Sequence, residues 1–214
     1  MLDYNTCERF PKKTNQNIKE TNKKNKKGIK IMCSTLDRLA DKKPDELLSE
    51  AGLDGCDSFI DLEKLLKHWN VSAKPVNFSK LKSFNSEGFR QLIDSKGAIL
   101  GAAVVNGDNL CIFYNEDDSP NRQRFTIAHE LAHFCNDYDI LAREGINCRF
   151  EEFSKTDEHE KEINAIAGAI LIPEGMLRNF YKRLLAPSAA KLAMIFGVSD
   201  AVMNARLEHL KIQI

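Results

Sequence analysis

The sequence predicts an α+β fold, in which a small antiparallel sheet packs on helices and a helical element follows at the C-terminus. Two apolar runs are separated by Asn106-Gly107, which is the strongest short signal for a β-hairpin. Segments with helical periodicity and helix start signals lie on both sides of these runs. The 214 residues are 43% hydrophobic and 29% charged, which suits one substantial domain or two small ones and excludes a wholly disordered chain.

The formal net charge of zero is the sum of two unlike segments. Residues 1–30 carry nine basic and three acidic side chains, a net charge of +6, which leaves −6 on residues 31–214. Because residues 1–30 are rich in Lys and Asn and poor in hydrophobic residues, we expect a flexible basic arm. Nucleic-acid binding by this arm is the less favoured interpretation, and the overall balance excludes a strongly basic protein that coats nucleic acid.

The longest apolar runs, residues 98–105 and 163–172, are about half of the roughly 20 residues that a membrane-spanning helix requires. Residues 1–30 also lack the continuous apolar stretch of a secretory signal. We therefore expect a cytoplasmic protein that does not enter a membrane. The six Cys are widely spaced and form no Cys-x-x-Cys pair, so free thiols are expected. Cys135 is better interpreted as a small buried side chain than as a catalytic nucleophile.

The first elements are short. Their boundaries follow from a proline that starts a helix, a glycine that ends it, and apolar periodicity. We expect helices at residues 44–51 and 59–69 and strands at residues 71–78, 98–105 and 110–114. The three strands make up the small antiparallel sheet.

Two longer helices follow the sheet. Ser119-Pro120 opens the first, with the hydroxyl as cap and the proline in the first turn, and this helix extends to about Asn136. The second starts near Asp157, whose side chain can cap it together with Glu160 in a pair that resembles a capping box, and it ends before Pro173.

The first long helix contains His129-Glu130-Leu131-Ala132-His133. Residues four apart share one helical face, so both imidazoles can reach one Zn²⁺, while Glu130 flanks the open coordination position. This spacing is typical of zinc metallopeptidases. A zinc ion lowers the pKa of its bound water to about 7, and Glu130 is placed to act as the general base.

A catalytic zinc usually has a third protein ligand, which we expect from the start of the second long helix. Helical phase favours Glu160, with His159 and Glu162 as lesser alternatives. Asn164, one turn after Glu160, is placed to hydrogen-bond a ligand histidine and fix its tautomer.

These segments together resemble the ImmA/IrrE metallopeptidases. The resemblance rests on residues 112–116, on Arg122 to His133, and on Glu160-x-x-x-Asn164 followed by Ile-Leu-Ile-Pro173. It implies zincin-like active-site helices within a peptidase domain at residues 31–173, with His129, His133 and Glu160 as zinc ligands and Glu130 as the catalytic base. It also implies a protein substrate, namely a DNA-binding helix-turn-helix repressor in a stress or mobile-element circuit.

Two features of such a peptidase stay open. The oxyanion can be stabilised by any of four side chains that the sequence does not rank: Tyr138, Tyr181, Arg122 and Arg124. An extended substrate can add to the edge of the strand at residues 110–114.

Residues 174–214 form the helical C-terminal element, which we expect to pack on the peptidase domain. We expect helices near residues 175–185, 188–196 and 199–210, and the last two have the shape of a helix-turn-helix with its turn at Gly197 and with Ala193, Val198 and Met203 in the core. Asn204 and Arg206 could read DNA, but Asp200 and Glu208 on the same helix disfavour it, so packing or substrate docking is preferred.

The rival function is a non-catalytic, zinc-containing regulator that binds DNA or a partner protein through this element. The presence of Glu130 argues against this regulator, because a purely structural zinc site needs no base.

Overall fold

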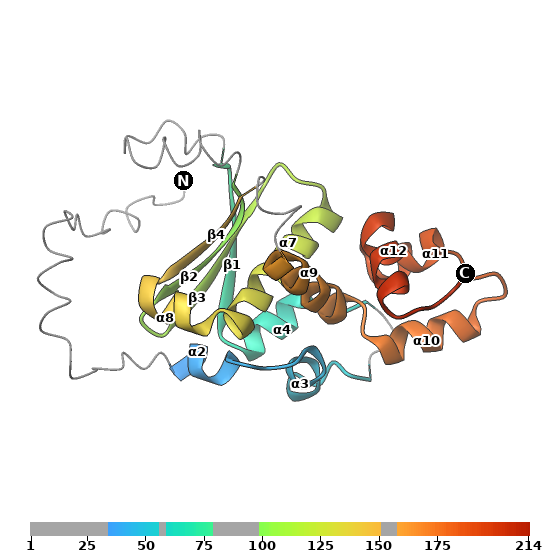
Figure 1. Ribbon diagram of the computed structural model, residues 1–214, viewed down its shortest axis with the longest axis horizontal. Coiled ribbons are helices and arrows are strands. Elements are labelled where there is room, and N and C mark those ends of the chain that lie inside the picture. Colours follow the sequence, from blue (N-terminus) through green and yellow to red (C-terminus); the bar gives the residue numbers. More distant parts are fainter. Residues whose placement is uncertain (1–33, 56–58, 79–98, 151–157) are drawn as a thin grey trace, which may run out of the picture. The chain divides into compact units, whose positions relative to one another are not determined.

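The computed structural model describes residues 34–55, 59–78, 99–150 and 158–214. The expected basic arm at residues 1–30 lies outside these ranges. Within them the fold is α+β, with four strands and a series of helices (Figure 1). The elements are α2 (Ser34–Leu39), α3 (Pro44–Glu50), α4 (Leu62–His68), β1 (Val71–Val76), β2 (Ile99–Asn106), β3 (Asn109–Asn115), α7 (Pro120–Asn136), α8 (Tyr138–Glu144), β4 (Ile146–Phe150), α9 (Glu158–Leu171), α10 (Glu174–Arg183), α11 (Ala189–Phe196) and α12 (Asp200–His209).

The described strands form one sheet in the order β1-β3-β2-β4. The hairpin expected at Asn106-Gly107 is confirmed: β2 pairs antiparallel with β3, and Gly107 has the positive φ of 61° that this turn requires. The expectation of a purely antiparallel sheet is wrong, because β1 runs parallel to β3. Strands β1 and β3 can pair in parallel because residues 77–108, which include β2, lie between them along the chain.

Strand β4 is a further difference from the sequence prediction. It pairs antiparallel with β2, and the register shifts between Ile99 and Gly101 of β2. Since β3 lies between β1 and β2, it has no free edge, and the expected addition of a substrate strand at residues 110–114 is wrong.

The helices before the sheet build part of the core. Helix α3 starts at Pro44 and is followed by Gly52 at φ 64°, as expected. Helix α4 starts three residues later than expected, because Asp61 caps it by accepting a hydrogen bond from the Lys64 backbone N–H at 3.0 Å. The indole of Trp69 is fully buried and donates from Nε1 to the Leu47 carbonyl at 3.2 Å, which ties α4 to α3.

Helix α7 has the expected bounds. Ser119 stands at its N-cap and Pro120 at its first position, but the Ser119 hydroxyl makes no capping hydrogen bond, so that part of the expectation is wrong. The Gln123 side chain fastens this end of the helix instead, since its amide donates to the Glu116 and Asp118 carbonyls at 3.0 and 2.9 Å.

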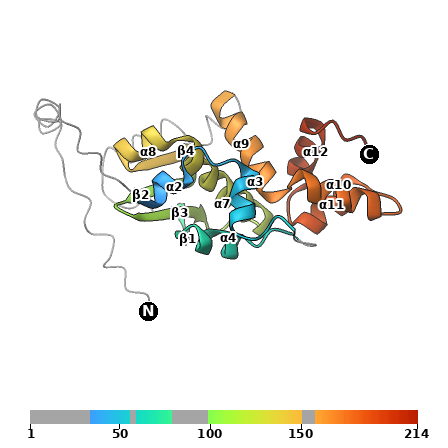
Figure 2. The same cartoon turned by 90° about the horizontal axis from the view of Figure 1, so that it is seen from below.

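Helix α9 packs along α7, as both ribbon views show (Figures 1 and 2). It begins at Glu158 and ends at Leu171, before Pro173, as expected. Its expected cap, Asp157, lies outside the described residues. Ile163, Ala167 and Ile170 of α9 are fully buried, so this face of the helix belongs to the core.

Helices α10, α11 and α12 lie together beyond α9 (Figure 2). Gly197 joins α11 to α12 in the left-handed region at φ 62°, and Ala193, Val198 and Met203 are buried as expected. Arg206 turns inward and donates from Nε to the Ile172 carbonyl at 3.1 Å, so it is not available to read DNA. Asn204 is exposed. No helix in the described ranges has the length and apolar composition needed to cross a membrane.

Candidate metal centre

The two histidines of α7 converge on one point. His129 and His133 are four residues apart on the helix, and their Nε2 atoms lie 3.0 Å apart. Both side chains are buried, with 0% and 1% of their surface exposed. The spacing on the helix therefore brings two imidazole nitrogens together beneath the surface, as predicted.

Glu160 of α9 completes the group. Its carboxylate oxygens lie 3.3 Å from His129 Nε2 and 3.7 Å from His133 Nε2. The alternatives, His159 and Glu162, lie elsewhere: Glu162 is exposed, and His159 points to Asp137. Of the three candidates, Glu160 is the one whose carboxylate lies beside both histidines, and its role as the third ligand stays a prediction.

Each histidine is held through its second ring nitrogen. Nδ1 of His129 lies 3.0 Å from Asn164 Oδ1, which is the contact predicted for Asn164. Nδ1 of His133 lies 2.5 Å from Asp137 Oδ2. When both Nδ1–H groups donate to these oxygens, the Nε2 lone pairs face the shared point.

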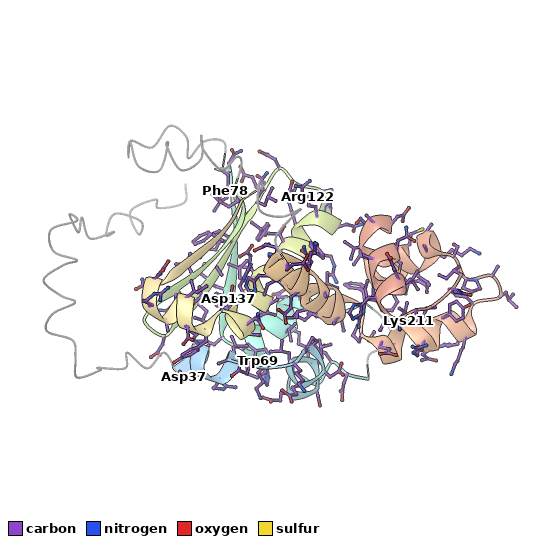
Figure 3. The ribbon with its side chains drawn as sticks, viewed as in Figure 1. Asp37, Trp69, Phe78, Arg122, Asp137 and Lys211 are labelled. Atoms are coloured by element: carbon purple, nitrogen blue, oxygen red, sulfur yellow. The ribbon has the colours of Figure 1, made fainter. Side chains whose placement is uncertain are left out.

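Asp137 was missed by the sequence analysis, although its position four residues after His133 could have revealed it. It caps α7 at the end opposite Arg122 (Figure 3). Its other oxygen lies 2.8 Å from His159 Nε2, so one carboxylate joins two imidazoles. A second set of possible metal donors, His133, Asp137 and His159, follows from this arrangement and shares His133 with the first.

The charges of these groups shift one another's pKa values. Burial lowers the pKa of His133, but the Asp137 hydrogen bond and the negative charges of Glu130, Asp137 and Glu160 outweigh it, so this pKa is raised. Burial raises the pKa of Asp137, but its hydrogen bonds and charge interactions with His133 and His159 outweigh that effect, so this pKa is lowered.

Glu130 lies beside the group and is fully buried. Its carboxylate reaches the neighbouring sheet: a Cβ added to Gly101 of β2 would stand 2.5 Å from Glu130 Oε1 and 2.7 Å from Thr126 Cγ2. A glycine next to the irregularity in β2 therefore leaves the space that this carboxylate occupies. The sequence analysis did not single out Gly101.

The four candidates for oxyanion stabilisation have hydrogen-bond partners or ion-pair partners elsewhere. Tyr138 donates to Asp37, and Tyr181 donates to the Gln213 carbonyl at 2.9 Å. Arg122 pairs with Asp118 at 3.3 Å, and Arg124 donates to the Ile60 carbonyl at 2.9 Å. These contacts do not single out any of the four.

Cys135 is a buried free thiol. Burial raises its pKa to about 12, and its Sγ lies 3.4 Å from the Leu131 carbonyl. A nucleophilic cysteine needs a lowered pKa, so the structure favours the packing role expected for this residue.

The donor set fits a catalytic metal. Two imidazoles and one carboxylate match the three protein ligands of a catalytic zinc site, which keeps a further position for water or substrate. The three side chains offer one donor atom each within 4.8 Å of one another. Asn164 and Asp137 supply the outer hydrogen bonds that ligand histidines require.

Comparison with known proteins agrees with this geometry. The family model for the IrrE N-terminal-like domain (Peptidase_M78) matches residues 74–208, which include the helices that carry the buried group. No curated protein and no solved structure matches the chain. The chain belongs to the ImmA/IrrE metallopeptidase family.

Proposed function

We propose that this protein is a zinc-dependent endopeptidase in which His129, His133 and Glu160 hold the ion and Glu130 is the catalytic base. The observation that carries the proposal is the position of Glu130, a buried carboxylate next to a buried group of two histidines and a glutamate. A structural metal site would need a fourth protein ligand and would not need this carboxylate.

The roles of the residues follow from their positions. A zinc ion in this group would supply a Lewis acid that acidifies water and polarises the scissile carbonyl. Glu130 accepts the proton of the attacking water and passes it to the leaving amine nitrogen. Asn164 and Asp137 keep the two imidazoles in the tautomer that presents Nε2 to the metal.

We further propose that the substrate is a DNA-binding helix-turn-helix repressor, cleaved at one site in a stress or mobile-element circuit. Two arguments support it. The resemblance to the ImmA/IrrE peptidases implies this class of substrate. Residues 31–214 carry a net charge of −6, which favours encounter with a basic partner such as a DNA-binding protein.

The test first searches the neighbouring genes for a helix-turn-helix repressor and then incubates that repressor with the purified zinc-loaded chain. The wild type should cut the repressor once, and Glu130→Gln should bind zinc and keep its fold but cut nothing. Glu162→Gln is the matched control, because this exposed glutamate of α9 lies outside the buried group, and it should cut normally. Full regulatory activity in Glu130→Gln would overturn the enzyme proposal and favour the non-catalytic regulator.

The ligand set has its own test. Glu160→Ala should lose most of its bound zinc, as measured by metal analysis after dialysis. Full occupancy in that variant would show that another residue is the third ligand, and His159 would then be the first candidate, since it already contacts Asp137.

A further inference from the structure

A pocket of about 390 Å³ lies between α9 and α12 and extends to α7. Small residues make much of its wall, namely Ala165 and Gly168 of α9 with Ala201 and Ala205 of α12. A Cβ added to Gly168 would meet nothing closer than Arg206 Cδ at 4.0 Å, which shows how open this wall is. A volume of a few hundred Å³ with a mainly apolar lining is typical of a binding pocket.

The pocket adjoins the candidate metal centre. Two of its lining residues, Phe125 and Asn164, are in contact with that centre. Phe125 precedes His129 by four residues, with the two ring centroids 6.2 Å apart, and Asn164 is hydrogen-bonded to His129. The pocket therefore begins about one helical turn, or about 6 Å, from the metal ligands on both helices. An extended peptide advances about 3.5 Å per residue, so a side chain next to the cleaved bond can reach it.

The charges around the pocket favour an apolar occupant. Three basic side chains line it, Lys161, Arg206 and His209. Lys161 is paired with Glu158 at 2.5 Å, and Arg206 donates to the Ile172 carbonyl, so two of the three are already engaged. The remaining wall is largely alanine, glycine, valine and phenylalanine, which offers dispersion and burial rather than hydrogen bonds.

We propose that this pocket is a specificity site, which receives a large apolar side chain of the substrate next to the scissile bond. The proposal rests on the endopeptidase function proposed above. It gives α12 a role in substrate selection, through the face that carries Ala201 and Ala205.

The first test measures binding without catalysis. Leucine, phenylalanine and glycine hydroxamates bind metal through the same group and differ only in the side chain, so their affinities for the zinc-loaded protein report on the pocket. Calorimetry should show the leucine and phenylalanine compounds binding about tenfold or more tightly than the glycine compound. Equal affinities for the three compounds would overturn the proposal.

A matched pair of variants locates the preference. Ala205→Phe fills the pocket from an exposed position of α12 and should abolish the preference for large side chains. Asn204→Phe adds the same group to the adjacent exposed position, which does not line the pocket, and should leave the preference intact. A preference that survives Ala205→Phe would place the specificity elsewhere.

The second test separates this proposal from the function on which it rests. A peptide mixture of known sequence is incubated with each protein, and the cut sites are identified by mass spectrometry. The wild type should cut beside large apolar residues, and Ala205→Phe should cut beside small ones. If no peptide is cut but the preference among the hydroxamates depends on Ala205, the endopeptidase proposal is overturned and the assignment of the pocket as a binding site for apolar side chains is supported. If peptides are cut with one unchanged profile in all variants, the pocket assignment fails and the function stands.

Discussion

Asp137 Oδ2 lies 2.5 Å from Nδ1 of His133, one helical turn after the histidine that it orients. The other oxygen of the same carboxylate lies 2.8 Å from His159 Nε2. The last turn of α7 and the first turn of α9 thus share one buried anion. This anion fixes the ring of one candidate metal ligand and links the two helices that carry the site.

Asp137→Asn should weaken zinc binding about 10–100-fold, because an amide is a poorer acceptor for the His133 Nδ1–H and carries no charge to balance the metal. Competition with a chromogenic chelator measures the affinity. Asp139→Asn, two residues further along at an exposed position, is the matched control and should bind zinc like the wild type. Equal zinc affinity for the Asp137 variant and the wild type would show that this hydrogen bond does not orient a ligand.

On acidification, zinc affinity should begin to fall at a pH above the usual histidine pKa of 6.5. The metal needs His133 without a proton on Nε2, and the pKa of His133 in the metal-free protein is raised above its usual value of 6.5. Protons therefore begin to compete above pH 6.5, and the affinity should drop by about tenfold per pH unit below that raised pKa. The pKa of Asp137 is lowered, so its carboxylate stays charged through this range. Chelator competition at a series of pH values measures the effect, and constant affinity down to the usual histidine pKa would contradict it.

Gly101→Ala should disturb the site from the sheet side. The added Cβ would stand 2.5 Å from Glu130 Oε1 and 2.7 Å from Thr126 Cγ2, so the carboxylate or the strand must move. Overpacking of this kind costs about 1–3 kcal/mol in the free energy of unfolding.

Cleavage by this variant should fall more than zinc affinity does, because Glu130 is displaced and the histidines are not. Gly175→Ala, near the start of α10, is the control: a Cβ there meets nothing within 4 Å, so stability should be unchanged or slightly higher. Cleavage at the wild-type rate in Gly101→Ala would show that the Glu130 carboxylate can accommodate the added Cβ without losing its catalytic position.

Cys135 should resist alkylation in the folded protein. Burial raises its pKa to about 12, so at a pH of about 8 only about one thiol in ten thousand is ionised. Peptide mapping after iodoacetamide treatment should show Cys111, which is only partly buried, labelled before Cys135, and both labelled after denaturation. Cys135→Ser should still cleave the substrate. A variant that keeps its fold and its zinc but no longer cleaves would show that Cys135 acts as a nucleophile.

Local signals explain what could be predicted from the sequence. The bounds of α7 and α9 follow from Pro120 and Pro173, and the meeting of His129 with His133 follows from their place on one helical face. Both kinds of inference depend on residues within a few positions of one another.

Contacts between distant segments were missed. The parallel pairing of β1 with β3 joins two strands that are separated by residues 77–108, which include β2, and no signal within a few residues of either strand indicates it. Gly101 and Glu130 meet because a strand packs against a helix. No sequence pattern near either residue indicates this contact. Strand β4 is a different case, since Ile-Asn-Cys-Arg-Phe alternates apolar and polar residues and could have been recognised.

The hydrogen bond from Arg206 to the Ile172 carbonyl ties residues 174–214 to the segment that follows α9. A chain shortened at Pro173 would lose the donor to a carbonyl that lies just after α9, and it would lose the α12 wall of the pocket as well. The end of the helix that presents Glu160 and Asn164 would then lose this hydrogen bond and its packing on α12, while its packing on α7 remains. We therefore expect that the smallest fragment of this protein that keeps the site intact extends through α12.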